Sequence, residues 1–237
     1  MKRLLALIVL PLLAACATQT GYMPAGAPAS VGPTPAKAGD YWEYAVRDGY
    51  TGLPRGLRRY EVTKADADRV VVDVSQDGQR VDTYVYAAGW NGIDVPLTNL
   101  ERWRYTPAWP AYAYPLAPGK TWYTVVQAND PLTRQTYSVH TRGKVVGWER
   151  IRVPAGEFDA LRVERYVYAG NHTGFKSQET ILETDWYVPA LNRTARSQGS
   201  SEHFDTSRGG GGGEGGGEYP LRIRGDWLIA ELVRYSR

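Results

Sequence analysis

Histidines and nucleophiles are few in this sequence, and their spacing matches no established catalytic or metal site. The three histidines, His140, His172 and His203, lack the paired spacing of metal ligands. No Gly-x-Ser-x-Gly nucleophile motif occurs. These patterns predict no metal site, no cofactor and no nucleophilic catalytic residue.

Three carboxylates could instead form an acid–base pair. Glu179, Glu183 and Asp185 include two residues on one face of a predicted strand. Acid–base hydrolysis needs two carboxylates held across a cleft at a defined separation. We expect a solvated strand face instead, so the sequence predicts that the protein is not an enzyme.

Aromatic side chains concentrate in the segment 103–116, where five of them alternate with three prolines, and one more tryptophan lies upstream. A loop of this kind is stiff and apolar with polar tips, which suits recognition of an amphiphile, a sugar or a protein. The alternative is that the segment caps the open end of a barrel and packs onto the core. The candidate binding residues are Trp90, Trp103, Tyr105, Trp109, Tyr112 and Tyr114.

The N-terminus carries the one cysteine of the chain. Lys2 and Arg3 precede a short apolar stretch that ends in Leu-Ala-Ala-Cys16. This arrangement resembles the lipobox of bacterial lipoproteins. The resemblance implies that Cys16 is diacylated on its sulfur, that the signal peptide, residues 1–15, is then removed, and that the new amino group of Cys16 is acylated. The alternative is a soluble signal peptide with an incidental cysteine.

The resemblance also implies a location. Ala17 and Thr18 follow the cysteine, in place of the aspartate that usually retains lipoproteins in the inner membrane. We therefore expect a protein anchored to the outer membrane by lipid and facing the periplasm. Two or three acyl chains give stable anchoring. No apolar run reaches the roughly 18 residues of a membrane-spanning helix.

Charge excludes one class of partner. The 237-residue chain has 28 basic and 25 acidic side chains, and loss of Lys2 and Arg3 leaves 26 basic ones. A net charge near +1 gives no electrostatic case for nucleic-acid binding. With a single cysteine, no intramolecular disulfide can form.

Composition divides the chain into three parts. Residues 1–15 are the signal peptide, 16–38 a lipidated cysteine and a flexible tether, and 39–237 the folded domain. The tether is rich in Pro, Gly, Ala, Ser and Thr and would extend about 60 Å at most. Within the domain, residues 208–218 contain eight glycines and predict a flexible loop.

The domain alternates apolar and polar residues with a period of two, which indicates half-buried strands. For example, Trp42, Tyr44 and Val46 share one face, as do Arg58, Tyr60 and Val62, and Val81, Thr83 and Val85 form another expected face of this kind. Eleven segments qualify: 41–46, 57–63, 69–74, 80–87, 121–127, 135–141, 144–153, 161–168, 180–188, 193–198 and 227–235. The prediction is an all-β fold, a single curved antiparallel sheet of about 10–11 strands that forms a barrel or half-barrel.

Three segments resemble the DUF3108-type domains, a group of bacterial envelope proteins of unknown function. They are 114–122 (YPLAPGKTW), 153–163 (VPAGEFDALRV) and 185–193 (DWYVPALNR). The resemblance implies a curved antiparallel sheet related to the half-barrels of the lipoprotein carriers LolA and LolB, and no known enzyme activity.

These expectations combine into one functional hypothesis. We expect a non-enzymatic, lipid-anchored envelope protein whose curved sheet binds an acyl chain or another amphiphile. The alternative is a structural or accessory subunit of an envelope protein assembly with no small-molecule site. A hydrolase acting on the cell wall is a third hypothesis.

Overall fold

The computed structural model describes residues 22–97, 102–173, 176–205 and 221–237. Within them the chain forms twelve strands, whose bounds are β1 Tyr41–Asp48, β2 Pro54–Ala65, β3 Val70–Gln76, β4 Gln79–Tyr86, β5 Gly92–Pro96, β6 Arg102–Trp109, β7 Thr121–Asn129, β8 Thr136–Val153, β9 Gly156–Thr173, β10 Lys176–Val188, β11 Arg193–Asp205 and β12 Leu221–Ser236. Two 3₁₀ turns, η1 (Ala88–Trp90) and η2 (Pro189–Leu191), complete these elements. No helix within the described ranges is long and apolar enough to cross a membrane. The predicted signal peptide, Cys16 and the glycine-rich loop 208–218 lie outside these ranges.

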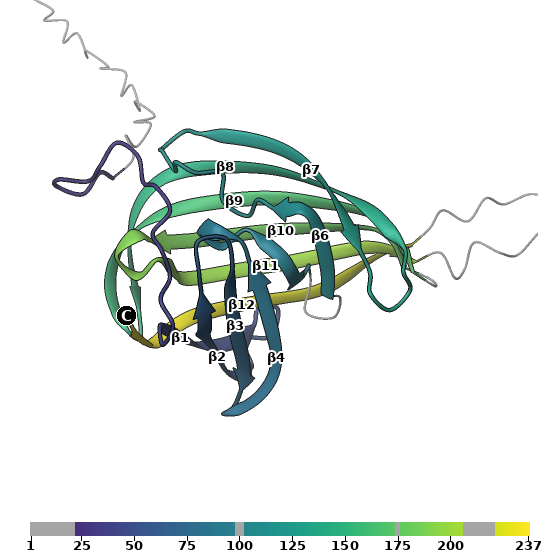
Figure 1. Ribbon diagram of the computed structural model, residues 1–237, viewed down its shortest axis with the longest axis horizontal. Helices are drawn as coiled ribbons and strands as arrows, with labels where there is room; N and C mark the ends of the chain where they lie inside the picture. The colour runs from purple at the N-terminus through teal and green to yellow at the C-terminus, as the bar shows by residue number, and fades with distance from the viewer. Residues whose placement is uncertain (1–21, 98–101, 174–175, 206–220) are drawn as a thin grey trace, which may run out of the picture.

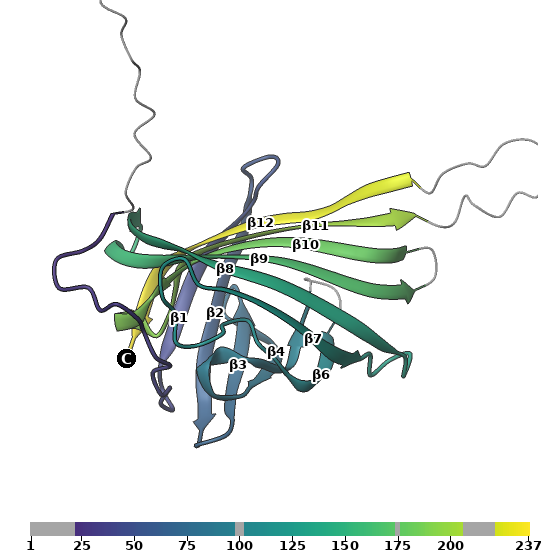
Figure 2. The same ribbon diagram turned by 90° about the horizontal axis from the view of Figure 1, so that it is seen from above.

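The strands form a closed barrel in which each strand pairs antiparallel with its neighbours in sequence and β12 returns to pair with β1. Strands β7–β12 run together along the long axis, and β1–β4 run across them (Figures 1 and 2). Closure gives every strand in the described residues a neighbour on both sides, which removes the two edge strands that a flat sheet of this size would have. The all-β, single-sheet prediction is confirmed.

The strand count differs from the prediction for identifiable reasons. The predicted strands 135–141 and 144–153 are one long strand, β8, interrupted only by a bulge between Val145 and Gly147. Strands β5 and β6 were not predicted, because Pro96, Pro107 and the aromatic run obscure their alternation.

The predicted inner faces are mostly correct. Trp42, Tyr44 and Val46 are buried inside the barrel. Strand β4 is the exception, because Val81 is 61% exposed and Tyr84 and Tyr86 point inward instead. In this strand the amphipathic tyrosines occupy the interior and the valines the surface.

One end of the barrel is plugged. This is the end at which β1 begins and β10 ends, and there η1, η2 and residues 110–116 fold onto the core. Trp42 and Trp90 meet edge to face with ring centroids 5.5 Å apart. Their indole N–H groups donate to the Leu191 carbonyl and the Asn192 side chain. Aromatic bulk with satisfied polar tips therefore fills this end.

Residues 22–38 differ from the expected flexible tether. Val31 is buried and exchanges two backbone hydrogen bonds with Leu116, of 2.8 and 2.7 Å. The Tyr22 hydroxyl donates to Asp159 at 2.9 Å, and the Arg150 guanidinium lies over the Tyr22 ring. The segment follows the plugged end of the barrel (Figure 1), because a few apolar and aromatic side chains suffice to hold an otherwise polar segment.

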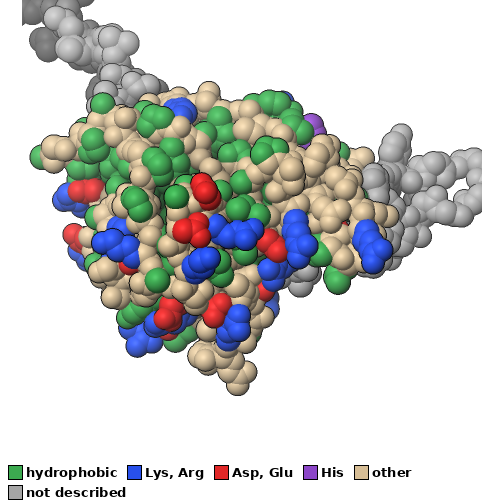
Figure 3. Space-filling view, viewed as in Figure 1, with side chains coloured by type: hydrophobic (Ala, Val, Ile, Leu, Met, Phe, Trp, Pro, Cys, Tyr) green, Lys and Arg blue, Asp and Glu red, His purple; other side chains and the backbone are tan. Residues whose placement is uncertain are grey.

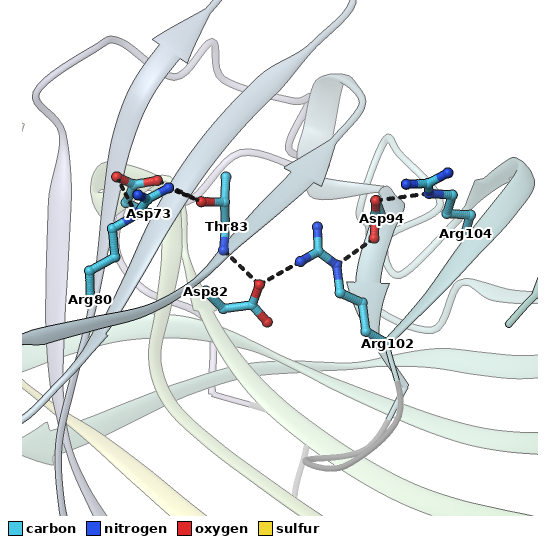
Figure 4. A network of polar contacts seen from close by, with 7 residues as sticks. All are labelled: Asp73, Arg80, Asp82, Thr83, Asp94, Arg102 and Arg104. Atoms are coloured by element: carbon cyan, nitrogen blue, oxygen red, sulfur yellow. Dashed lines mark hydrogen bonds and ion pairs between the residues drawn. The ribbon is translucent and has the colours of Figure 1, made fainter. Parts of the chain in front are cut away.

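An ion-pair network reinforces the weakest seam of the sheet. Strands β4 and β5 pair at only two positions. Arg102 on β6 crosses this seam, donating to Asp94 on β5 at 2.6 Å and to Asp82 on β4 at 2.5 Å (Figure 4). Arg80 and Arg104 extend the network to β3 and along β6. On the surface, basic and acidic groups alternate over β2–β6 (Figure 3).

We predict that Arg102→Ala lowers the free energy of unfolding by about 1 kcal/mol, because three strands lose a shared partner that is only partly exposed. Equilibrium denaturation measures this change. The matched control is Arg152→Ala, whose pair with Glu157 is largely exposed and should contribute less than about 0.5 kcal/mol. Equal effects of the two substitutions on the free energy of unfolding would contradict the conclusion that Arg102 reinforces the β4–β5 seam.

The β1–β2 turn supplies a pH test. The Asp48 carboxylate pairs with Arg55 at 2.6 Å and accepts the Thr51 and Tyr50 backbone N–H groups. The Arg55 guanidinium and these N–H groups lower the pKa of Asp48 to about 2.

A lowered pKa stabilises the fold above the unfolded-state pKa near 3.8, and this contribution is lost as the pH falls toward about 2. We predict that wild type is more stable than Asp48→Asn at pH 7 and that the gap narrows between about pH 4 and pH 2. Urea denaturation across this range measures it. A gap that does not change with pH would contradict the prediction.

Candidate functional site

The interior of the barrel contains a cavity with two adjoining lobes of about 230 and 210 Å³. The two lobes share the lining residues Tyr44, Tyr60, Glu183, Ser197 and Ala230, so they lie directly beside each other. The second lobe adjoins the plugged end, and the first lies toward the opposite end. A site of this size suits one small ligand or part of a larger one.

The first lobe combines apolar and charged walls. Its apolar side chains include Val46, Leu97, Ile181 and Leu228. Its charged side chains are Arg58, Glu183 and Asp226. A bare hydrocarbon would desolvate these charges without replacing their hydration, so the lining favours a ligand with a polar group.

The second lobe holds a buried arginine between two acids. Arg165 on β9 is buried, and its guanidinium pairs with Glu183 at 2.9 Å and Asp185 at 2.7 Å, both on β10. It also donates to the Ala111 carbonyl at 3.2 Å. The predicted solvated face of β10 is therefore wrong: Glu183 and Asp185 point into the barrel, where one arginine pairs with both.

Tyr112 completes this cluster. Its hydroxyl donates to Asp185 at 2.7 Å, and Arg165 lies over its ring at 5.2 Å. Burial raises the pKa of Tyr112 well above its ordinary value, and the negative charge of Asp185 adds to the shift. The phenol therefore stays neutral at physiological pH and acts as a hydrogen-bond donor.

A second arginine of this lobe has a different environment. Arg193, the first residue of β11, lies 4.3 Å from the ring centroid of Trp90 and within 5.2–5.6 Å of the ring centroids of Trp42, Tyr60 and Tyr86. It lines the cavity and keeps part of its surface accessible there. Among the described residues, no carboxylate forms an ion pair with it.

The sequence-predicted binding residues are brought together, but mostly inside the protein. Trp103, Tyr105 and Trp109 are buried on β6, and Trp109 donates to the Thr141 hydroxyl at 2.9 Å. Tyr114 is partly buried against the core. Two of the six, Trp90 and Tyr112, line the second lobe of the cavity, and Trp109 lines a neighbouring pocket that also contains Trp90 and Arg193. The segment 103–116 therefore packs onto the core, as expected for the alternative of a capping segment. It also contributes the aromatic side chain of Tyr112 to the cavity wall.

Sequence reasoning missed the charged residues of the cavity. Arg165 stands between Val163 and Val167 on the apolar parity of its strand, and Arg58 shares a face with Tyr60. A charge at a position that alternation assigns to the interior is the signal that could have identified them. Arg193 begins its strand, where alternation carries no such information.

The histidines lie on β8, β9 and β11. Among the described residues, no group of three His, Cys, Asp or Glu side chains has the arrangement of a metal site. His140 accepts or donates one hydrogen bond with the Tyr123 hydroxyl, at 2.7 Å on the outer surface.

Comparison with known proteins identifies the fold. No protein-family model and no curated protein sequence matches this chain. A candidate lipoprotein of Parabacteroides distasonis ATCC 8503 is similar in structure, with a TM-score of 0.51 and 15% identity over 87% of this chain and 99% of that chain. The similarity shows a shared barrel fold.

Two further solved structures are more distant. An exported-protein candidate of Bacteroides fragilis NCTC 9343 with a YmcC-like fold has a TM-score of 0.47 and 14% identity, over 87% of this chain and all of that chain. The hypothetical lipoprotein YmcC of Escherichia coli K12 has a TM-score of 0.41 and 10% identity, over 84% and 85% of the two chains. The relationship to DUF3108-type domains and to LolA and LolB stays a prediction.

We predict that Trp109→Ala lowers the free energy of unfolding by about 3–5 kcal/mol, because it empties a buried indole site and leaves Thr141 without its partner. Tyr112→Phe should cost about 2 kcal/mol, because Asp185 loses a buried donor. Tyr123→Ala on the outer surface is the control, with an effect below about 1 kcal/mol. Unchanged stability of Trp109→Ala would show that this segment is a detachable surface loop.

Proposed function

We propose that this chain is a non-enzymatic, lipid-anchored protein of the bacterial outer membrane that faces the periplasm and binds an amphiphile inside its barrel. The observation that carries the proposal is the interior cavity, whose two lobes each combine apolar or aromatic side chains with charged ones. A ligand with a polar head and an apolar tail matches both kinds of side chain. The lipobox-like sequence at Cys16 supports the anchor.

Two features support binding over catalysis. Glu183 and Asp185, the two carboxylates that line the second lobe, both pair with Arg165, and Asp185 also accepts from the Tyr112 hydroxyl. Groups engaged in this way stabilise the wall and are not poised for proton transfer to a substrate. Catalysis would need an acid and a base whose environments differ.

An accessory role in a protein assembly is the second candidate, and the outer surface favours it. Tyr123, Val125, Tyr166 and Leu182 are 44–57% exposed on the outer faces of β7, β9 and β10. Their neighbours in register bring them onto one stretch of the sheet. Exposed apolar patches of this kind often mark protein interfaces.

The native mass of the protein distinguishes the two candidates. Residues 17–237, which include every residue that the structure describes, would be exported to the periplasm without Cys16 and purified without detergent. We predict a mass above that of the polypeptide, with an amphiphile recovered by solvent extraction. A mass equal to the polypeptide alone would contradict ligand binding and favour the accessory role. The matched reference is the same protein after solvent extraction and refolding, whose mass should equal that of the polypeptide alone.

A further inference from the structure

Arg193 carries a positive charge that the described residues of the barrel do not neutralise with a carboxylate. Arginine stays protonated in proteins, so it cannot escape the desolvation of the interior by losing its charge. An interior cation is normally paired with an anion. The cavity therefore contains a charge whose natural complement is absent from the described part of the chain.

The partners that Arg193 does have are neutral. Four aromatic rings surround the guanidinium, which lies closest to Trp90. Tyr44 and Tyr86 line the same lobe as Arg193, and burial keeps both phenols neutral by raising their pKa values. Ring stacking engages the faces of a guanidinium and leaves N–H donors along its edges for a planar or tetrahedral anion.

The acids of the same lobe are already engaged. Glu183 and Asp185 pair with Arg165 at 2.9 and 2.7 Å, and Asp185 also holds the Tyr112 hydroxyl. Arg165 thus belongs to a cluster in which its charge is paired with two carboxylates, whereas among the described residues the charge of Arg193 has no carboxylate partner. Both arginines line the second lobe, so an anion that enters this lobe meets Arg193 there.

We propose that Arg193 binds the anionic headgroup, a carboxylate or a phosphate, of the amphiphile that occupies the barrel. This inference rests on the proposed function and names the ligand's chemical class. The first lobe continues from this position toward the end opposite the plug, and Val46, Leu97, Ile181 and Leu228 line it. The headgroup lies at the plugged end, and the tail extends into the first lobe, where Arg58, Glu183 and Asp226 leave only part of the wall apolar.

Four probes with the same twelve-carbon tail test the inference: dodecanoate, dodecyl phosphate, dodecyl maltoside and dodecyltrimethylammonium. Calorimetric titration of residues 17–237 below the critical micelle concentration of each probe gives the affinities. We expect at least one anionic probe to bind about tenfold or more tightly than the neutral and cationic probes. The two anionic probes separate carboxylate from phosphate recognition.

Variants assign the preference to a residue. Arg193→Gln should abolish the advantage of the anionic probe, and Arg193→Lys should keep part of it, because lysine retains the charge but not the planar fork. Arg196→Gln is the control: Arg196 lies on the same strand, with its side chain on the opposite face near Trp186 and Glu231. It should leave the preference unchanged. Cooperative unfolding of each variant shows that the barrel is intact.

The outcomes separate this inference from the proposed function. Equal binding of all four probes would overturn anion recognition while leaving a ligand-binding barrel. An anionic preference that persists in a folded Arg193→Gln variant would also overturn it. If no probe binds, the headgroup inference fails, and the native-mass measurement decides the proposed function independently. If Arg193→Gln does not fold, the wild-type preference and Arg193→Lys decide.

Discussion

Closure of twelve strands into one ring is the constraint on which the rest of the structure depends. A barrel of about eight strands is just filled by its own side chains, and a wider one leaves space inside. This chain fills part of that space with tryptophan and tyrosine, of which it has 8 and 17, against 3 phenylalanines. These large rings plug one end of the barrel, where the N–H groups of Trp42 and Trp90 and the O–H group of Tyr44 find hydrogen-bond partners. Behind the plug the barrel stays hollow.

The hollow part is where the chain places charge. Arg165 is held by two acids and a backbone carbonyl, which satisfies its donors and fixes β9 against β10 and the segment around Ala111. Arg193 is held by rings and phenols, which stabilise its position without neutralising it. Two arginines of one lobe therefore have different environments: Arg165 is paired with acids, and Arg193 is the one that we propose faces a ligand.

Much of this architecture follows from alternation in the sequence. The inward residues Trp42, Tyr44 and Val46 and the all-β class could be predicted because each strand obeys a period of two. The faces of β4 could not, because both parities hold residues of comparable hydrophobicity and only the curvature of the sheet decides between valines and tyrosines. The charged residues of the cavity were not predicted, because ion pairs across strands, such as Arg165 with Asp185, depend on the register between strands. The pattern within a single strand does not contain that register.

The attachment of Tyr22 to Asp159 and Arg150 has a consequence for how the barrel stands on a membrane. Only five residues separate Cys16 from Tyr22, so the proposed lipid on Cys16 would hold the barrel within about 20 Å of the bilayer, a third of the reach of a free tether. The contact lies on the β8–β9 hairpin, at the plugged end. With the proposed anchor, that end would be kept toward the lipid and the first lobe would lie toward the aqueous side. The proposed ligand would then exchange with partners that arrive through the aqueous space, while the anchoring leaflet would face a wall of aromatic rings.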